Sequence, residues 1–225
     1  MRKPLVAVGV VFGVGALLTA AVKAPPAMAG SLSRRNGAPA VPRAWVPPVK
    51  SDRWECIVIH HSATDFGGAA RFDKGHRAKG WDELGYHFVI GNGTDSGNGQ
   101  VEVGPRWPKQ KWGAHAKTPN NEYNDFGIGI CLVGNFDIER PTPQQMQSLA
   151  RLTAYLMRTY HISGNNILGH KDTKQTDCPG KNLNVAQVRR MAEQILADAG
   201  DSSDSVVARP ASAESGTELM TNGGQ

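Results

Sequence analysis

Three short, continuous apolar runs lie in the middle of the chain, separated by segments in which apolar and polar residues are mixed. They cover residues 56–60, 86–90 and 128–133. Each is rich in β-branched or aromatic residues and is bounded by glycine or polar positions, which predicts buried strands. Residues 90–99 are dense in turn formers and lead into Val101–Val103, which indicates a hairpin or a long loop.

The clearest helical pattern covers Pro143–Tyr160. Thr142 can serve as the N-cap, proline occupies the first helical position, and Gln145 completes a capping box. Apolar residues then recur at helical spacing, so one face of this helix is predicted to be buried. These residues are Met146, Leu149, Leu152 and Leu156.

Two more helices are predicted. Residues 185–199 can be capped by Asn184, and a weaker pattern over residues 69–79 places Phe72 and His76 on one face. The first of these carries an apolar stripe of Val185, Val188, Met191 and Ile195. Because strands and helices alternate along the chain, the predicted fold class is α/β.

The length of 225 residues and an apolar content of 40% fit one domain with extensions. The N-terminus has a basic start, an apolar stretch at 5–22 and a small-residue cleavage site before Gly30, which predicts a signal peptide over residues 1–29. The alternative is a retained membrane anchor, since an apolar stretch of about 18 residues just reaches the lower limit for a spanning helix.

The composition suggests boundaries for the remaining parts. Residues 30–52 are rich in Pro, Ala, Ser and Arg and are expected to form a flexible linker. The domain is expected at 53–199. Residues 200–225 hold few large apolar side chains and are expected to be a disordered tail.

The charge pattern fits an exported domain. Loss of the three basic residues in the predicted signal takes the formal charge from +5 to +2, and the acidic tail returns the central part to +5. A modest basic surface suits an anionic polymer such as cell wall. No Lys/Arg cluster is interleaved with aromatic residues, which argues against nucleic acid as a partner. We expect a monomer that contacts a membrane only if the N-terminal segment is retained.

Three cysteines are too few for a disulfide framework, even in an oxidising compartment. Cys56 and Cys131 lie inside apolar runs and are predicted to be small buried thiols. The alternative is a disulfide between them, which needs Cα atoms within about 7 Å.

His60, His170 and Cys178 form a candidate metal site split across the chain. Imidazole nitrogen and thiolate sulfur suit Zn²⁺, and three protein ligands leave the fourth tetrahedral position open for water or substrate. A structural zinc site would normally be closed by a fourth ligand, often in Cys-x-x-Cys pairs, which this chain lacks. The pattern therefore indicates a hydrolase with one zinc ion per chain.

Five motifs in fixed order identify a family resemblance. They are Ile-His-His-Ser-Ala-Thr (59–64), Leu-Gly-Tyr-His-Phe-Val-Ile (84–90), Trp-Gly-Ala-His-Ala (112–116), Gly-Ile-Gly-Ile-Cys-Leu-Val-Gly (127–134), and Leu-Gly-His-Lys-Asp (168–172) with Thr-Asp-Cys-Pro-Gly (176–180). Over residues 53–196 the chain resembles the type 2 N-acetylmuramoyl-L-alanine amidases, which include phage T7 lysozyme and the peptidoglycan recognition proteins. Five ordered motifs are far more specific than one.

The resemblance implies a mixed central sheet flanked by helices, with one zinc ion in a surface groove held by His60, His170 and Cys178. It implies cleavage of the amide between the lactyl group of N-acetylmuramic acid and L-alanine of the stem peptide, in peptidoglycan or in muropeptides. The complete ligand set favours an enzyme. Two alternatives stay open: a recognition module that binds wall fragments without cutting them, and a zinc hydrolase of another amide.

Two residues beside the metal are expected to be catalytic by the same resemblance. Tyr86 matches the family's catalytic tyrosine, although a strand tyrosine buried for packing is the alternative. Thr176 stands where the T7 lysozyme-like enzymes have lysine and active recognition proteins have threonine. Cys131 replaces the glutamate base of the related cytosolic wall-recycling amidases, so a glutamate-based mechanism is not expected.

Five further residues are candidates for the substrate groove. His115 either hydrogen-bonds substrate or is structural, and His61 is expected on the opposite face of its strand from His60, in the core or in support of the metal site. Trp81, Trp107 and Trp112 lie near the groove motifs, where their rings can stack on sugar or peptide or can fill the core.

Overall fold

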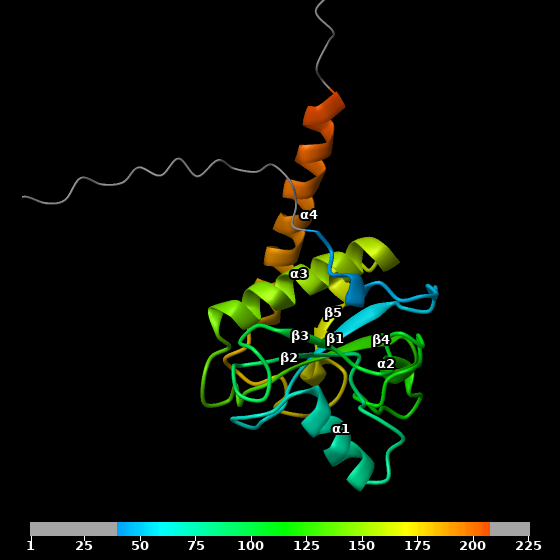
Figure 1. Cartoon of the computed structure of the whole chain (residues 1–225), viewed down its shortest axis with the longest axis vertical. Coiled ribbons are helices and arrows are strands. Elements are labelled where there is room, and N and C mark those ends of the chain that lie inside the picture. Colours follow the sequence, from blue (N-terminus) through cyan, green and yellow to red (C-terminus); the bar gives the residue numbers. More distant parts are fainter. Residues whose placement is uncertain (1–39, 208–225) are drawn as a thin grey trace, which may run out of the picture. The chain divides into compact units, whose positions relative to one another are not determined.

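A five-stranded mixed sheet is the centre of the part of the chain that the computed structural model describes, residues 40–207, with side chains for residues 40–200 (Figure 1). The strand order is β3-β2-β4-β1-β5. The bounds are Cys56–His61 for β1, Phe88–Ile90 for β2, Val101–Val103 for β3, Gly127–Leu132 for β4 and Ile167–Gly169 for β5. The α/β class with a mixed sheet is therefore confirmed.

The two longest strands, β1 and β4, run parallel to each other in the middle of the sheet. Every residue of both strands is buried, as expected for parallel strands covered on both faces. β5 and β2 add to them in parallel, and only the edge strand β3 is antiparallel, in register with β2. Of the two alternatives given for the segment after residue 90, a hairpin or a long loop, the antiparallel pairing of β2 with β3 shows the hairpin.

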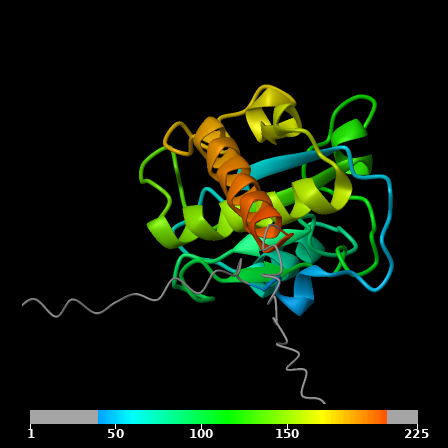
Figure 2. The same ribbon diagram turned by 90° about the horizontal axis from the view of Figure 1, so that it is seen from above.

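Helices cover both faces of this sheet. α3 (Pro143–Tyr160) and α4 (Val185–Val207) pack against each other above it, and α4 crosses α3 when seen from above (Figures 1 and 2). The short α1 (Ala69–Ala78) lies on the other side, where Phe72 packs against a small buried cluster of Leu84, Val89 and Val133. The main core fills the space under α3 and α4, with Ile57, Ile59, Phe88 and Ile130 of the sheet among its members.

The capping box predicted for α3 is present. The backbone N–H of Gln145 donates to the Thr142 hydroxyl at 3.0 Å, and the backbone N–H of Thr142 donates to the Gln145 side-chain oxygen at 3.1 Å. These two bonds satisfy N–H groups that the first helical turn leaves unpaired, and they fix the start of the helix.

Two element boundaries differ from the sequence prediction by two residues or more, and two short elements were not predicted. The strand expected from residue 86 begins only at Phe88, so Tyr86 lies in the preceding loop. β5 and the one-turn helix α2 (Glu122–Asp125) were not predicted, because three- and four-residue elements are too short to show a period. α4 continues to Val207, past the end expected at residue 199.

Part of the segment expected as a linker belongs to the folded domain. Trp45, in the 3-10 turn η1 (Arg43–Trp45), is only 6% exposed and joins the main core. Its carbonyl accepts hydrogen bonds from Trp107 Nε1 at 2.8 Å and from the Tyr155 hydroxyl at 3.2 Å. The predicted signal peptide, residues 30–39 of the linker and residues 208–225 of the tail lie outside the described residues.

Trp45→Ala is expected to destabilise the domain by about 3 kcal/mol or more, because it removes a buried indole and leaves a cavity beside Tyr155. The measurement is urea unfolding of the metal-free protein. Val49→Ala is the matched control in the same segment, since Val49 is 73% exposed and its loss should change stability by no more than about 0.5 kcal/mol. Equal unfolding midpoints for the two variants would contradict the core role of Trp45.

No helix within residues 40–207 combines the length and the apolar character needed to span a membrane.

Candidate metal centre and active site

The three candidate ligands meet at one edge of the sheet. His60 stands at the end of β1, and His170 follows β5 directly as the first residue of the 3-10 turn η3 (His170–Asp172). Because β1 and β5 are parallel neighbours, their carboxyl ends lie side by side, and such ends commonly form ligand sites in α/β sheets. The two imidazole rings are 4.5 Å apart between centroids. The loop after η3 then brings Cys178 to the same edge.

The donor atoms of this cluster are close enough together to share one metal ion. One ligand atom each from His60, His170 and Cys178 lies within 4.8 Å of the others, and Cys178 Sγ is 3.7 Å from His60 Nδ1. Nitrogen and sulfur ligands at about 2.0–2.3 Å from a tetrahedral zinc ion lie roughly 3.3–3.8 Å apart. His170 Nε2 is buried without a hydrogen-bond partner, so it is available as a ligand. The cluster could therefore hold a metal ion.

Burial keeps both candidate ligand histidines neutral. It lowers the pKa of His60 well below its usual value and that of His170 to about 4, so each ring carries a lone pair at neutral pH. Burial also raises the pKa of the Cys178 thiol to about 11. Only the thiolate binds metal, so metal binding must release the thiol proton.

Backbone groups hold Cys178 in place. Its sulfur accepts a hydrogen bond from the His61 N–H at 3.4 Å, and its own N–H donates to the Thr176 hydroxyl oxygen at 3.3 Å. The Thr176 hydroxyl proton is not used in that bond and can be donated to another group.

Tyr86 lies directly beside the cluster. Its ring is 5.3 Å from the His60 ring, and it lines the same cleft as the three candidate ligands. Burial raises the pKa of Tyr86 well above its usual value. The phenol therefore stays protonated at neutral pH and can act as an O–H donor.

A cleft of about 410 Å³ opens over these residues. It brings together most of the residues that the sequence placed at the site: the three ligand candidates, Tyr86, Thr176, His61 and His115. Two carboxylates on its lining, Asp137 and Asp177, were not predicted. Asp177 is part of the Thr-Asp-Cys-Pro-Gly motif, but Asp137 stands in no motif that could have marked it.

A second pocket of about 360 Å³ adjoins the first at His115. Trp81 lines it as expected, and Lys117, Lys174, Asp82 and Asn124, none of them predicted, contribute polar groups. The pocket therefore joins an aromatic wall with two cationic side chains.

The other two tryptophans considered for the groove, Trp112 and Trp107, do not line either cleft. Trp112 is half exposed, with Lys111 Nζ 5.2 Å from its ring. Trp107 is fully buried and packs against Phe88 and Tyr160, so the core alternative considered for it is correct and a groove role is wrong.

His61 and His115 have defined hydrogen-bond partners. His61 Nδ1 accepts from the Phe136 N–H at 3.1 Å, and its Nε2 is 4.0 Å from Asp137 at the cleft. His115 Nδ1 is 3.1 Å from Nε2 of the ligand candidate His60. Burial lowers the pKa of both histidines, so both rings are neutral at neutral pH.

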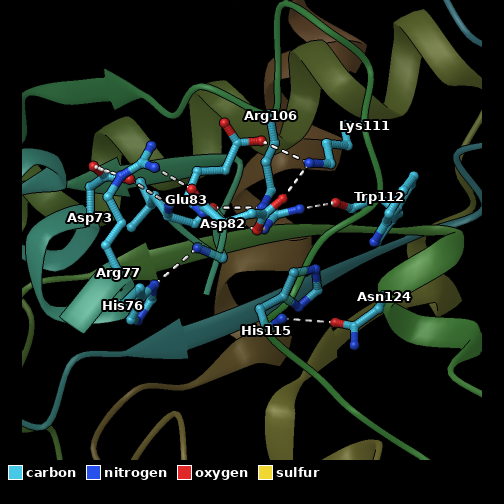
Figure 3. A network of polar contacts seen from close by, with 12 residues as sticks. Asp73, His76, Arg77, Asp82, Glu83, Arg106, Lys111, Trp112, His115 and Asn124 are labelled. Atoms are coloured by element: carbon cyan, nitrogen blue, oxygen red, sulfur yellow. Dashed lines mark hydrogen bonds and ion pairs between the residues drawn. The ribbon is translucent and has the colours of Figure 1, made fainter. Parts of the chain in front are cut away.

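A network of charges holds the loops that carry Tyr86 and His115 (Figure 3). The buried Arg106 guanidinium donates to the Leu84 carbonyl at 2.6 Å, to the Trp112 carbonyl at 2.8 Å and to the Asp82 carboxylate. Each of its three nitrogens donates to a different acceptor, whereas the donors of a lysine ammonium all lie on one nitrogen. Lys111 adds a further ion pair to Asp82. The network thereby ties residues 82–84 to the 106–112 segment beside the site.

Comparisons with known proteins agree with this geometry. The family model described as N-acetylmuramoyl-L-alanine amidase matches residues 50–181. The endolysin of Enterobacteria phage T3 is 35% identical over an alignment of 137 positions that covers 57% of this chain and 82% of the endolysin. Peptidoglycan-recognition protein LB of Drosophila melanogaster is 33% identical over 141 residues, which are 62% of this chain and 53% of that protein.

Among solved structures, the N-acetylmuramoyl-L-alanine amidase LysC from Clostridium intestinale URNW superposes with a TM-score of 0.54 at 34% identity. The match covers 68% of this chain and 95% of LysC. The predicted family is thereby confirmed: this chain belongs to the N-acetylmuramoyl-L-alanine amidases.

Proposed function

We propose that this protein is a zinc-dependent amidase that hydrolyses the bond between N-acetylmuramic acid and L-alanine in peptidoglycan or its muropeptides. The observation that carries the proposal is the complete cluster of His60, His170 and Cys178 at the base of an open cleft. A protein that only recognised wall fragments would have no need for three neutral or ionisable donor groups facing one point.

The donor set favours zinc over other common ions. Two imidazoles and one thiolate suit a borderline-soft cation, whereas Mg²⁺ and Ca²⁺ prefer oxygen ligands. Zinc bound there would supply Lewis acidity toward the scissile carbonyl and lower the pKa of water to about 7.

The protein's own residues stabilise charge in this mechanism. The protonated hydroxyl of Tyr86 donates to the carbonyl oxygen as negative charge develops on it, and the Thr176 hydroxyl contributes a second, weaker donor. Burial raises the pKa of Cys131, so this thiol stays protonated and does not act as a base. The leaving amine of L-alanine must gain a proton before it departs.

The substrate is proposed to extend from the metal cleft into the adjoining pocket. Trp81 offers an apolar face there, and Lys117 and Lys174 offer positive charge to the carboxylates that wall peptides carry. Action on peptidoglycan also fits export, for which we propose that residues 1–29 serve as the signal. The catalytic domain is proposed to act as a monomer, with a linker before it and a C-terminal tail after it.

The test is digestion of purified peptidoglycan with the reaction products analysed by mass spectrometry. We expect release of stem peptides that begin with L-alanine, complete loss of release after a chelator has removed the metal, and recovery with about one equivalent of Zn²⁺. Binding of wall without release would instead support the recognition module, and cleavage of a different amide would support a zinc hydrolase of another amide. Full activity in verified metal-free protein would refute the zinc mechanism.

A further inference from the structure

His115 is joined by hydrogen bonds to a metal ligand on one side and to the backbone on the other. Its Nε2 is 3.2 Å from the Gly127 carbonyl oxygen, and its Nδ1 is 3.1 Å from His60 Nε2. A carbonyl oxygen can only accept, so His115 Nε2 must carry the proton, and the neutral ring then offers its lone pair at Nδ1. His60 must therefore donate from Nε2.

The consequence for His60 is a single tautomer. With its proton on Nε2, the lone pair of His60 lies on Nδ1, the atom that faces Cys178 Sγ at 3.7 Å. The opposite tautomer would place a proton between His60 and the other two ligands. It would also leave two lone pairs, on His60 Nε2 and His115 Nδ1, facing each other in a buried site.

The surroundings of His115 hold its ring in this orientation. A methyl group on Gly129 would come within 2.4 Å of the ring, and one on Gly113 within 2.3 Å, so only glycine fits on these two sides. The Asn124 side-chain oxygen accepts from the backbone N–H groups of His115 and Ala116, at 2.7 and 2.8 Å (Figure 3). Ring and backbone are therefore both held by protein groups.

We infer that His115 is a positioning residue of the metal centre: it fixes His60 in the tautomer that presents Nδ1 to the metal, through a relay from the Gly127 carbonyl. Both of its ring nitrogens are used in this relay, so neither is left to hydrogen-bond substrate. Partners of this kind raise metal affinity because they orient the ligand and fix its proton. The inference rests on the metal centre of the proposed function, and its tests use no wall substrate.

The first experiment needs no substitution. In the metal-free, ¹⁵N-labelled wild-type protein at neutral pH, long-range ¹H–¹⁵N spectra report which nitrogen of each histidine carries the proton. We expect His60 to be protonated at Nε2 and unprotonated at Nδ1 before any zinc is added, and His115 to be protonated at Nε2. A proton on His60 Nδ1 would overturn the inference.

The second experiment compares two substitutions of nearly equal shape. His115→Asn keeps an acceptor oxygen near the position of Nδ1, whereas His115→Leu has the same branching without one. We expect His115→Leu to bind Zn²⁺ about 10–100-fold more weakly in competition with a chromogenic chelator, and His115→Asn to recover most of that loss. The melting temperatures of the two metal-free variants should be similar.

The two outcomes that contradict the inference are specific. Equal weakening in both variants would mean that the ring serves only packing, and wild-type affinity in His115→Leu would mean that His60 needs no partner. If His115→Leu does not fold, the tautomer measured in the wild-type protein decides the question. If the tautomer and the zinc affinities are as expected but the protein does not cleave wall, the proposed function is refuted and the inference about His115 stands.

Discussion

Cys178→Ser is expected to abolish tight zinc binding and amidase activity together. Serine keeps the shape of the side chain but replaces a soft thiolate by a hydroxyl that does not ionise near neutral pH. The remaining donors, His60 and His170, are too few to hold zinc against water. Metal content should fall from about one equivalent to near zero. The value of kcat should fall by at least about 10³-fold, because the lost Lewis acid stabilises the transition state by several kcal/mol. Elemental analysis and muropeptide digestion measure the two effects.

The chain supplies two matched controls for this substitution. Cys56 and Cys131 are also free thiols, both buried, and neither belongs to the ligand cluster. Cys56→Ser and Cys131→Ser should keep about one equivalent of zinc, with any loss appearing as a lower melting temperature. If Cys131→Ser lost the metal and Cys178→Ser retained it, the ligand assignment would be wrong.

The long and fully buried elements could be predicted from the sequence because one physical signal dominates each of them. β1 and β4 are continuous apolar runs, and α3 has both a cap and a clear stripe. β5 could not be predicted, because a three-residue strand becomes a strand only through its pairing with β1. Pairing also explains the late start of β2, since the register with β4 begins at Phe88 and leaves Tyr86 outside the ladder.

The candidate ligands could be found because their residue types and motifs carry chemical meaning without any knowledge of distance. The contacts that support these ligands could not be found from the sequence. The hydrogen bond between His60 and His115 joins residues 55 positions apart, and no pattern in the chain relates them. Asp137 and Lys174 reach the two clefts from loops, where position depends on tertiary packing rather than on a period. Motifs thus indicate which groups act, while packing determines what holds them.

Tyr86→Phe is expected to lower kcat by about 10²–10³-fold while leaving the metal in place. The substitution deletes only the hydroxyl of a residue that lines the cleft and is not one of the three candidate ligands, His60, His170 and Cys178. Because burial keeps this phenol protonated, its loss removes the O–H donor that the proposed mechanism uses for the developing oxyanion. KM, zinc content and melting temperature should change little, since the ring still packs at 5.3 Å from that of His60.

Thr176 gives the comparison that separates this donor role from packing. Thr176→Ala also removes a hydroxyl from the lining of the cleft, but this hydroxyl accepts from the Cys178 N–H, and it is a weaker, neutral donor. We expect a smaller loss in kcat than for Tyr86→Phe, and partial activity in Thr176→Lys, because a lysine ammonium can also stabilise an oxyanion. Both should be measured as kcat and KM on a defined muropeptide with zinc content verified. A Tyr86→Phe variant that cleaves at the wild-type rate would show that the tyrosine serves only packing, since the ring is retained and only the O–H is lost.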